Sequence, residues 1–172
     1  MPKKYRRHFL KAKEARLLFE EALEWLKTDL NDLFNSKVSV ELVETNFAEI
    51  FLINGRPLLV KARKTFFPTL VFNEIFASSP KVVVDMGAVP HICKGADVMA
   101  PGIVRFEGEF KDGDLVLVVD ERHGKPLAVG KAVYDVNTAK TVTRDVVVKS
   151  IHFVGDNVWN FIKNLQLRLS EN

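Results

Sequence analysis

The chain has 172 residues, of which 47% are hydrophobic and 27% charged, proportions typical of a globular protein with one domain or two small ones. A single cysteine, Cys93, excludes an internal disulfide framework and is typical of a reducing compartment. No apolar run is long enough to span a membrane, and the charged start is too polar for a secretory leader. We therefore expect a cytoplasmic protein with no membrane partner.

The net charge of +3 is unevenly distributed, because residues 1–16 contain seven lysines and arginines against one acid, Glu14. The basic positions are Lys3, Lys4, Arg6, Arg7, Lys11, Lys13 and Arg16. A basic arm on a near-neutral body is typical of proteins that bind a polyanion. A solvated tail that only keeps the protein soluble is the alternative.

Residues 1–79 predict a small α+β domain. An apolar stripe at helical spacing indicates a core-facing helix, and its members are Ala15, Leu18, Phe19, Ala22, Trp25 and Leu26. Asp29 is expected to begin a short second helix. Three strands follow at about 38–42, 48–53 and 58–63, with an Asn54-Gly55 turn between the last two. Thr69 is expected to cap a short helix ahead of a linker at 78–80.

The stretch 80–106 contains Val82 to Val84, which predict a buried strand, and then three glycines, Gly87, Gly95 and Gly102. Glycine tolerates positive φ and has no Cβ, so these positions indicate tight turns and close approach of a ligand. Gly102 follows Pro101, which predicts a turn whose second residue needs positive φ.

From residue 113 onward the pattern is all-β until a last helix that begins near Gly155-Asp156. Strands are expected at 115–119, 126–133 and 146–153, with a looser polar segment at 135–143. Short strands with glycine-containing turns favour a barrel. The fold class is therefore α+β: an N-terminal α+β domain with a basic arm at 1–79, and a C-terminal β-barrel with a helix at 80–172.

The order and spacing of several short motifs in 80–160 resemble the PUA domain, the small RNA-binding β-barrel of pseudouridine synthases and archaeosine transglycosylases. These motifs are Asp85, Gly87-Ala88, Gly95-Ala96, Pro101-Gly102-Ile103, Gly113-Asp114, Ala128-Val129-Gly130, His152 to Asp156, and Trp159. One departure is Arg144-Asp145, which stand where the family usually has a glycine, so the connection at 137–145 is expected to differ in shape.

The N-terminal part resembles the malignant-T-cell-amplified-sequence family, which shares its architecture with the first part of ligatin. The resemblance rests on Asn54-Gly55, the basic strand end Lys61 to Lys64, and Phe67-Pro68-Thr69-Leu70 just ahead of a PUA domain. It implies an archaeal-type translation factor that acts on the small ribosomal subunit and the tRNA acceptor end in initiation, reinitiation or recycling. It also implies that the N-terminal domain meets the ribosome and a protein partner.

Single-stranded RNA ends are recognised by stacking, by base-edge hydrogen bonds and by contacts between phosphates and cations or main chain. The expected RNA-binding residues are Gly87, Ala88, Lys94, Gly95, Ala96, Met99, Pro101, Gly102, Arg105, Lys149 and His152. The expected ribosome-binding or partner-binding residues are Lys3, Lys4, Arg6, Arg7, Lys61, Arg63 and Lys64. The alternatives are that the glycines only form tight corners, that the cations are solvated, and that His152 is a hydrogen-bonded barrel residue.

Other chemistry is not supported by the sequence. His91 and Cys93 lie two apart, but no second pair completes a metal site. Asp85 and Asp97 could be paired acid–base carboxylates, yet a helix cap and a turn are the favoured roles. No nucleotide, nucleophile-elbow or metalloprotease motif is present.

We therefore expect no cofactor and no catalysis. Three function classes remain: a translation factor that binds tRNA 3′ ends or rRNA, an RNA-modification enzyme or its accessory subunit, and a protein-interaction module that presents Phe66 and Phe67.

Overall fold

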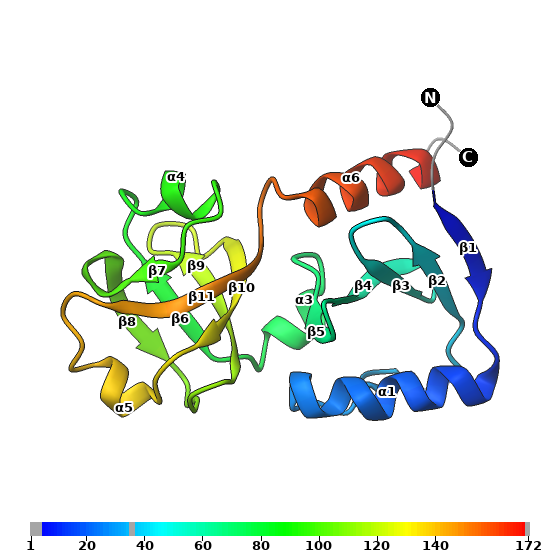
Figure 1. The fold of residues 1–172 in the computed structure, drawn as a ribbon, viewed down its shortest axis with the longest axis horizontal. Helices are drawn as coiled ribbons and strands as arrows, with labels where there is room; N and C mark the ends of the chain where they lie inside the picture. The colour runs from blue at the N-terminus through cyan, green and yellow to red at the C-terminus, as the bar shows by residue number, and fades with distance from the viewer. Residues whose placement is uncertain (1–4, 35–36, 171–172) are drawn as a thin grey trace. The chain divides into compact units, whose positions relative to one another are not determined.

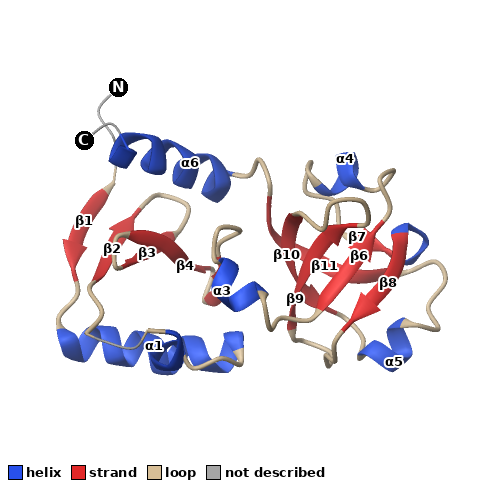
Figure 2. Ribbon diagram, turned by 180° about the vertical axis from the view of Figure 1, so that it is seen from behind, coloured by secondary structure: helices blue, strands red, loops and turns tan. Residues whose placement is uncertain are grey.

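The computed structural model describes residues 5–34 and 37–170, and the chain divides into two compact units after Ile75 (Figure 1). Each unit is built on one sheet, and Figure 2 shows the strands of both. No described helix is both long enough and apolar enough to cross a membrane. The predicted boundary at 79/80 stays a prediction, since the division by contacts falls four residues earlier.

The N-terminal unit is an antiparallel five-stranded sheet in the order β1-β2-β3-β4-β5, in which each strand pairs with its neighbour in sequence. The strands are β1 (Arg6–Phe9), β2 (Val40–Glu44), β3 (Glu49–Ile53), β4 (Arg56–Ala62) and β5 (Thr65–Pro68). The helices are α1 (Ala12–Leu26), α2 (Leu30–Leu33) and α3 (Asn73–Phe76), the last lying at the division.

The long helix α1 forms where the apolar stripe predicted it. Ala15, Leu18, Phe19 and Ala22 are buried at spacings of three and four residues. The carboxylate of Glu14 accepts the N–H of Lys11 at 2.8 Å, which satisfies one of the free amides at the helix start. The helix ends at Lys27, whose left-handed φ of 56° terminates the last turn.

Two strands of the N-terminal unit, β1 and β5, were not predicted from the sequence, and neither were β7 and β8 of the C-terminal unit. Arg6–Phe9, expected to be part of a basic arm, pair with β2, while residues 1–4 with Lys3 and Lys4 lie outside the described residues. β5 was missed because its turn, Arg63-Lys64, holds two non-glycine residues at φ 50° and 65° and lacks the Asn-Gly signal. Thr69 does not cap a helix, since its hydroxyl donates to the carbonyl of Pro57 at 2.7 Å.

The C-terminal unit is a curled six-stranded sheet in the order β7-β11-β10-β9-β6-β8, with β6 and β9 parallel and the other pairs antiparallel. The strands are β6 (Lys81–Val84), β7 (Val98–Met99), β8 (Ile103–Glu107), β9 (Leu115–Asp120), β10 (Pro126–Ala132) and β11 (Val146–Phe153). The helices are α4 (Val89–Ile92), the 3₁₀ turn η1 (Ala100–Gly102), α5 (Val136–Ala139) and α6 (Asn157–Ser170).

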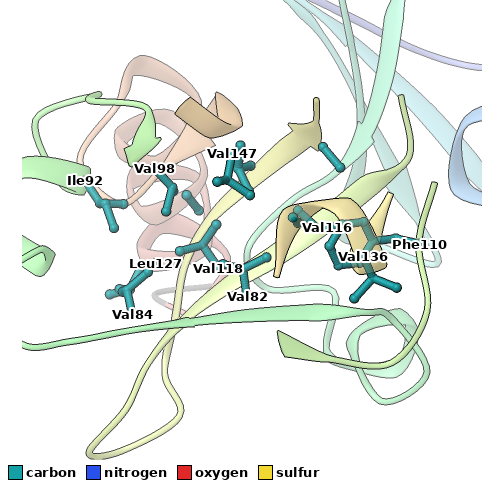
Figure 3. Packing of buried hydrophobic residues seen from close by; sticks show 14 residues of the cluster. Val82, Val84, Ile92, Val98, Phe110, Val116, Val118, Leu127, Val136 and Val147 are labelled. Atoms are coloured by element: carbon teal, nitrogen blue, oxygen red, sulfur yellow. The ribbon is translucent and has the colours of Figure 1, made fainter. Parts of the chain in front are cut away.

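Alternate residues of these strands fill one apolar core, shown in Figure 3. Val82, Val84, Val116 and Val118 come from the parallel pair β6 and β9 and are at most 1% exposed. Ile92 of α4 and Val98 of β7 close the same core from the connections. The segment at 135–143, expected to be loose, contains α5, whose start is capped by Asp135 accepting the N–H of Thr138 at 2.9 Å.

Gly130 explains how the sheet curls. A Cβ at this position would lie 2.3 Å from Cγ1 of Val148 and 2.7 Å from the carbonyl oxygen of Lys149. The absence of a side chain therefore allows β11 to cross β10 closely, next to the bulge between Val129 and Gly130.

Candidate nucleic-acid interface

Two segments of the C-terminal unit line a groove of about 470 Å³. One segment, residues 85–92, connects β6 to α4, and the other, residues 96–102, runs through β7 and η1. The N–H of Asp85 donates to the carbonyl of Gly102 at 2.9 Å and joins the two walls. The lining residues are Asp85, Gly87, Ala88, His91, Ile92, Ala96, Asp97, Val98, Met99, Pro101 and Gly102.

The three glycines of this stretch have three different roles. Gly102 lies in η1 without positive φ, so the predicted turn conformation is wrong; its need for glycine comes from Ala88, whose Cβ would lie 3.1 Å from an added Cβ. Gly95, which is half-buried, has a φ of 93°, and a Cβ there would lie 3.0 Å from the ring of Phe153, so its need for glycine comes from backbone conformation and packing against Phe153. Gly87 is exposed and lines the groove.

The groove unites six of the eleven residues predicted to bind RNA, namely Gly87, Ala88, Ala96, Met99, Pro101 and Gly102. The other five, Lys94, Gly95, Arg105, Lys149 and His152, are not among its lining residues. The sequence argument missed Ile92 and Val98, which form the apolar floor and are 2% and 3% exposed. The only sequence feature that could have identified Ile92 and Val98 as groove residues is that they are isolated β-branched residues close to the glycines.

The cations predicted to bind RNA differ in whether they form ion pairs within the protein. Lys94, directly after α4, and Lys149 on β11 are exposed, and neither has an ion-pair partner among the residues that the structure describes. Arg105 on β8 is exposed, but its guanidinium lies 3.2 Å from the carboxylate of Glu107. A side chain that is already paired offers less net charge to a phosphate.

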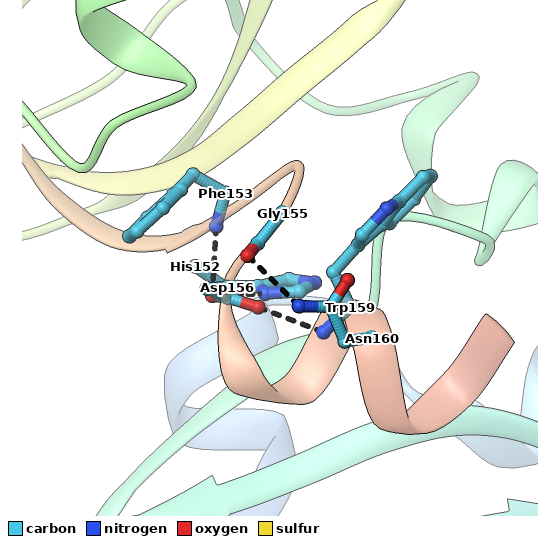
Figure 4. Close-up of polar contacts among 6 residues, drawn as sticks. All are labelled: His152, Phe153, Gly155, Asp156, Trp159 and Asn160. Carbon is cyan, nitrogen blue, oxygen red and sulfur yellow. Dashed lines mark hydrogen bonds and ion pairs between the residues drawn. The ribbon is translucent and has the colours of Figure 1, made fainter. Parts of the chain in front are cut away.

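His152 needs a correction, because its side chain is 0% exposed and cannot contact RNA from this position. Its Nδ1 lies 2.8 Å from Oδ2 of Asp156, as Figure 4 shows. The same carboxylate accepts the N–H of Phe153 at 3.0 Å and of Trp159 at 2.7 Å. Burial alone would raise the pKa of Asp156. The hydrogen bonds that its carboxylate accepts and its contact with His152 have the larger combined effect, so the pKa lies below its ordinary value. His152 is therefore a structural residue that ties β11 to the start of α6.

The two carboxylates of the groove accept backbone N–H groups, but not in the roles that the sequence favoured: α4 starts after Ala88 without a side-chain cap, and Asp97 bonds to β11 and not within a turn. Oδ1 of Asp85 accepts the N–H of Ala88 at 2.9 Å, and Oδ1 of Asp97 accepts the N–H of Ser150 at 2.9 Å. In the described ranges, 5–34 and 37–170, no group of three His, Cys, Asp or Glu side chains is placed to hold a metal ion.

The N-terminal unit has a second groove, of about 520 Å³, between α1 and the β4–β5 hairpin. Its lining residues are Glu20, Glu21, Glu24, Trp25, Lys61, Lys64 and Phe66. Nζ of Lys61 lies 3.7 Å from Oε2 of Glu21 and 5.1 Å from the ring centre of Phe66. The predicted basic cluster of Lys61, Arg63 and Lys64 therefore faces acidic residues on one side, and only Arg63 and Lys64 are exposed at the hairpin tip.

Two further expectations concern this unit. Phe66 and Phe67 are each 2% exposed, so they belong to the core and are not presented to a partner. On β1, Arg7 is held by Glu41 through two hydrogen bonds of 2.7 and 3.0 Å, which together with the nearby charge raise the pKa of its guanidinium. Arg6 is exposed beside it.

Comparison with known proteins accounts for both units. Residues 80–154 match the PUA domain, and residues 6–72 match a domain of unknown function, DUF1947. An uncharacterised protein of Methanocaldococcus jannaschii is 37% identical over 157 residues, which cover 91% of this chain and 96% of that protein. A crystal structure from Pyrococcus horikoshii OT3 has a TM-score of 0.76 at 33% identity, covering 91% of this chain and 99% of the other. These matches define a PUA-domain protein with a DUF1947 region before the barrel.

More distant relatives carry functional names. The homologue of malignant T-cell-amplified sequence 1 from Dictyostelium discoideum is 28% identical over 78% of each chain. Translation machinery-associated protein 20 of Saccharomyces cerevisiae is 25% identical over 77% of each chain. The chain belongs to the malignant-T-cell-amplified-sequence family of PUA-domain proteins, with archaeal relatives along almost its whole length.

Proposed function

We propose that this protein binds RNA without catalysing a reaction, and acts in the cytoplasm on the small ribosomal subunit and the acceptor end of tRNA. The observation that carries the proposal is the groove between residues 85–92 and 96–102, which brings two of the glycine-containing PUA motifs, Gly87-Ala88 and Pro101-Gly102, to one surface. The names of the relatives, which include a translation machinery-associated protein, support a role in translation.

The groove has the chemistry that a single-stranded RNA end requires. Its walls are mainly apolar, from Ala88, Ile92 and Met99, and suit the face of an unstacked base. Exposed cations lie outside the groove, at Lys94 and Lys149, where they can neutralise phosphates. Gly87 leaves the main chain accessible at the groove wall.

The N-terminal unit is proposed to meet the ribosome or a protein partner. The exposed cations Arg6, Arg63 and Lys64 are the residues that support this assignment, with Arg7 and Lys61 committed to Glu41 and Glu21. The proposed RNA groove lies in the C-terminal unit and the proposed ribosome-binding cations lie in the N-terminal unit, so substitutions can test each site separately.

The test uses a matched pair of exposed apolar residues. Met99 is 45% exposed and lines the groove, whereas Val104 on β8 is 48% exposed and does not. Met99→Ala should weaken binding of a short single-stranded RNA with a free 3′ end about fivefold, because a base loses an apolar contact worth about 1 kcal/mol. Val104→Ala should leave the affinity unchanged. Equal effects of the two variants in fluorescence anisotropy would place the RNA elsewhere.

A crosslinking experiment tests the cellular partners. The full chain is crosslinked to RNA in a cell extract, and the attached RNA is sequenced. Recovery of tRNA 3′ ends with small-subunit rRNA supports the proposal, whereas recovery of unrelated messenger RNA contradicts it.

A further inference from the structure

The groove in the C-terminal unit has three titratable residues in its lining, Asp85, Asp97 and His91. Asp85 and Asp97 line it, and no lysine or arginine does so in the described part of the chain. Two carboxylates disfavour a phosphate group at short range. The groove is therefore suited to a neutral base, and the phosphates belong outside, near Lys94 and Lys149.

The two carboxylates are fixed in place but have acceptor capacity left. Each uses Oδ1 for a backbone amide, from Ala88 for Asp85 and from Ser150 for Asp97, both at 2.9 Å. Neither Oδ2 has a protein donor among the described residues. An ionised carboxylate only accepts hydrogen bonds, so Asp85 and Asp97 offer oriented acceptors that require donors on the ligand, while the ring of His91 is a lining group that can itself donate.

RNA bases differ in what they can donate. Cytosine and adenine carry an exocyclic amino group on the Watson–Crick edge, and guanine adds a ring N–H to its amino group. Uracil has one ring N–H between two carbonyl oxygens, which a carboxylate repels. Carboxylate acceptors held in fixed positions therefore favour bases that carry an exocyclic amino group over uracil, which has none.

We propose that this groove selects a base with an exocyclic amino group and discriminates against uracil, with Asp85 and Asp97 as the specificity-determining residues. The inference rests on the proposed RNA-binding function and specifies which RNA ends the same groove takes. Stacking against Met99 and Ile92 supplies affinity, and the carboxylates supply the choice of base.

The experiment compares short RNAs that are identical except for a 3′-terminal cytosine, adenine or uracil, using the full chain and fluorescence anisotropy. The wild-type protein should bind the cytosine and adenine ends roughly tenfold more tightly than the uracil end. Asp97→Asn keeps an oxygen for Ser150 and replaces the other oxygen with an amide donor, which suits a uracil carbonyl. This variant should narrow or reverse the preference.

Asp135→Asn is the matched control. Asp135 is also an exposed aspartate of this unit that accepts a backbone N–H at 2.9 Å, from Thr138, but it does not line the groove. It should leave the base preference as in the wild type. A preference that persists in Asp85→Asn, in Asp97→Asn and in the double variant overturns the assignment to these carboxylates.

A change in the RNA makes the test independent of protein folding. A 3′-terminal N4,N4-dimethylcytosine keeps the ring but has no amino hydrogens, and it should bind as weakly as uracil. Tight binding of all four RNAs with equal affinity overturns the inference while leaving RNA binding intact. Failure of the protein to bind any of them overturns the proposed function itself.

Discussion

The two units use their acidic residues differently. In the N-terminal unit, Glu41, Glu74 and Glu21 pair with cationic side chains, Arg7, Arg56 and Lys61, and two further acids, Glu14 and Asp29, accept backbone N–H groups. In the C-terminal unit, six aspartates accept backbone N–H groups, at positions Asp85, Asp97, Asp114, Asp120, Asp135 and Asp156.

This difference affects which charges are free for a partner. Surface ion pairs contribute little to stability and hold their cations, whereas aspartates that cap the backbone stabilise turns and leave the lysines unpaired. In the N-terminal unit, therefore, several cationic side chains are already paired with glutamates of the same unit. The C-terminal unit, although its acids are as numerous, keeps Lys94 and Lys149 available at the surface.

The largest expected effect tests whether backbone geometry dominates the C-terminal unit. Gly130→Ala should destabilise it by about 3 kcal/mol, because the added Cβ overlaps Val148 and the Lys149 carbonyl. Gly124→Ala is the control, as nothing lies within 4 Å of its Cβ position and only its φ of 64° costs energy, about 1 kcal/mol. Urea unfolding measures both, and similar losses would contradict the close approach of β10 and β11.

A second prediction concerns the aspartates as backbone acceptors. Asp156→Ala should cost about 2–3 kcal/mol, because it removes the cap of α6 and leaves buried His152 without this partner. Asp135→Ala removes an exposed cap of a single-turn helix and should cost clearly less. A larger loss of thermal stability in Asp135→Ala than in Asp156→Ala would contradict the prediction that the Asp156 carboxylate contributes more to stability.

The pH dependence of stability follows from the same group. The pKa of Asp156 is lowered in the folded protein, so its contribution is fully present above the unfolded value of about 3.8 and is lost as the pH falls through the folded value. Urea unfolding between about pH 7 and pH 3 should therefore show a steep acid limb. Asp156→Asn should flatten that limb, and an unchanged slope would assign the acid sensitivity to other carboxylates.

The hairpin tip of the N-terminal unit separates stability from binding. Replacing Arg63-Lys64 with Asn-Gly should stabilise the unit by about 1 kcal/mol, because both positions have positive φ like the existing Asn54-Gly55 turn. The same change removes two exposed cations and should weaken co-sedimentation with the small ribosomal subunit. Retained association in the stabilised variant would remove this tip from the proposed ribosome surface.

The smallest effect distinguishes a paired from an unpaired arginine on β1. Arg6→Ala should lower the log–log salt slope of RNA or subunit binding by roughly 0.7, the value for one phosphate contact on a single strand. Arg7→Ala should leave the slope unchanged and cost about 0.5–1 kcal/mol of stability, because its guanidinium is held by Glu41. Equal slopes for both variants and the wild type would leave β1 without a role in binding.

Much of the fold could be predicted because periodicity and turn chemistry are local. The stripe of α1, the Asn54-Gly55 turn and the strand β11 follow from spacing alone. β1 could not be predicted, because four exposed residues show no alternation, and its pairing with β2 depends on chain segments thirty residues apart.

The candidate site was predictable in part for the same reason. Glycines identified the groove walls, but which glycine lines the groove depends on contacts with Phe153 and Ala88 that local sequence patterns do not show. His152 was included among the RNA-binding residues with a hydrogen-bonded barrel role as the alternative, because the sequence of β11 alone does not reveal its contact with the carboxylate of Asp156.

The strand order has a consequence for how the protein is made. Each strand of the N-terminal sheet pairs with the next in sequence, so that sheet can form as the chain leaves the ribosome. In the C-terminal sheet, β7 pairs with β11, which is synthesised nearly fifty residues later. One wall of the candidate groove therefore has no strand partner until the barrel is almost complete, so a truncated or stalled chain would lack this groove even where its N-terminal sheet has formed.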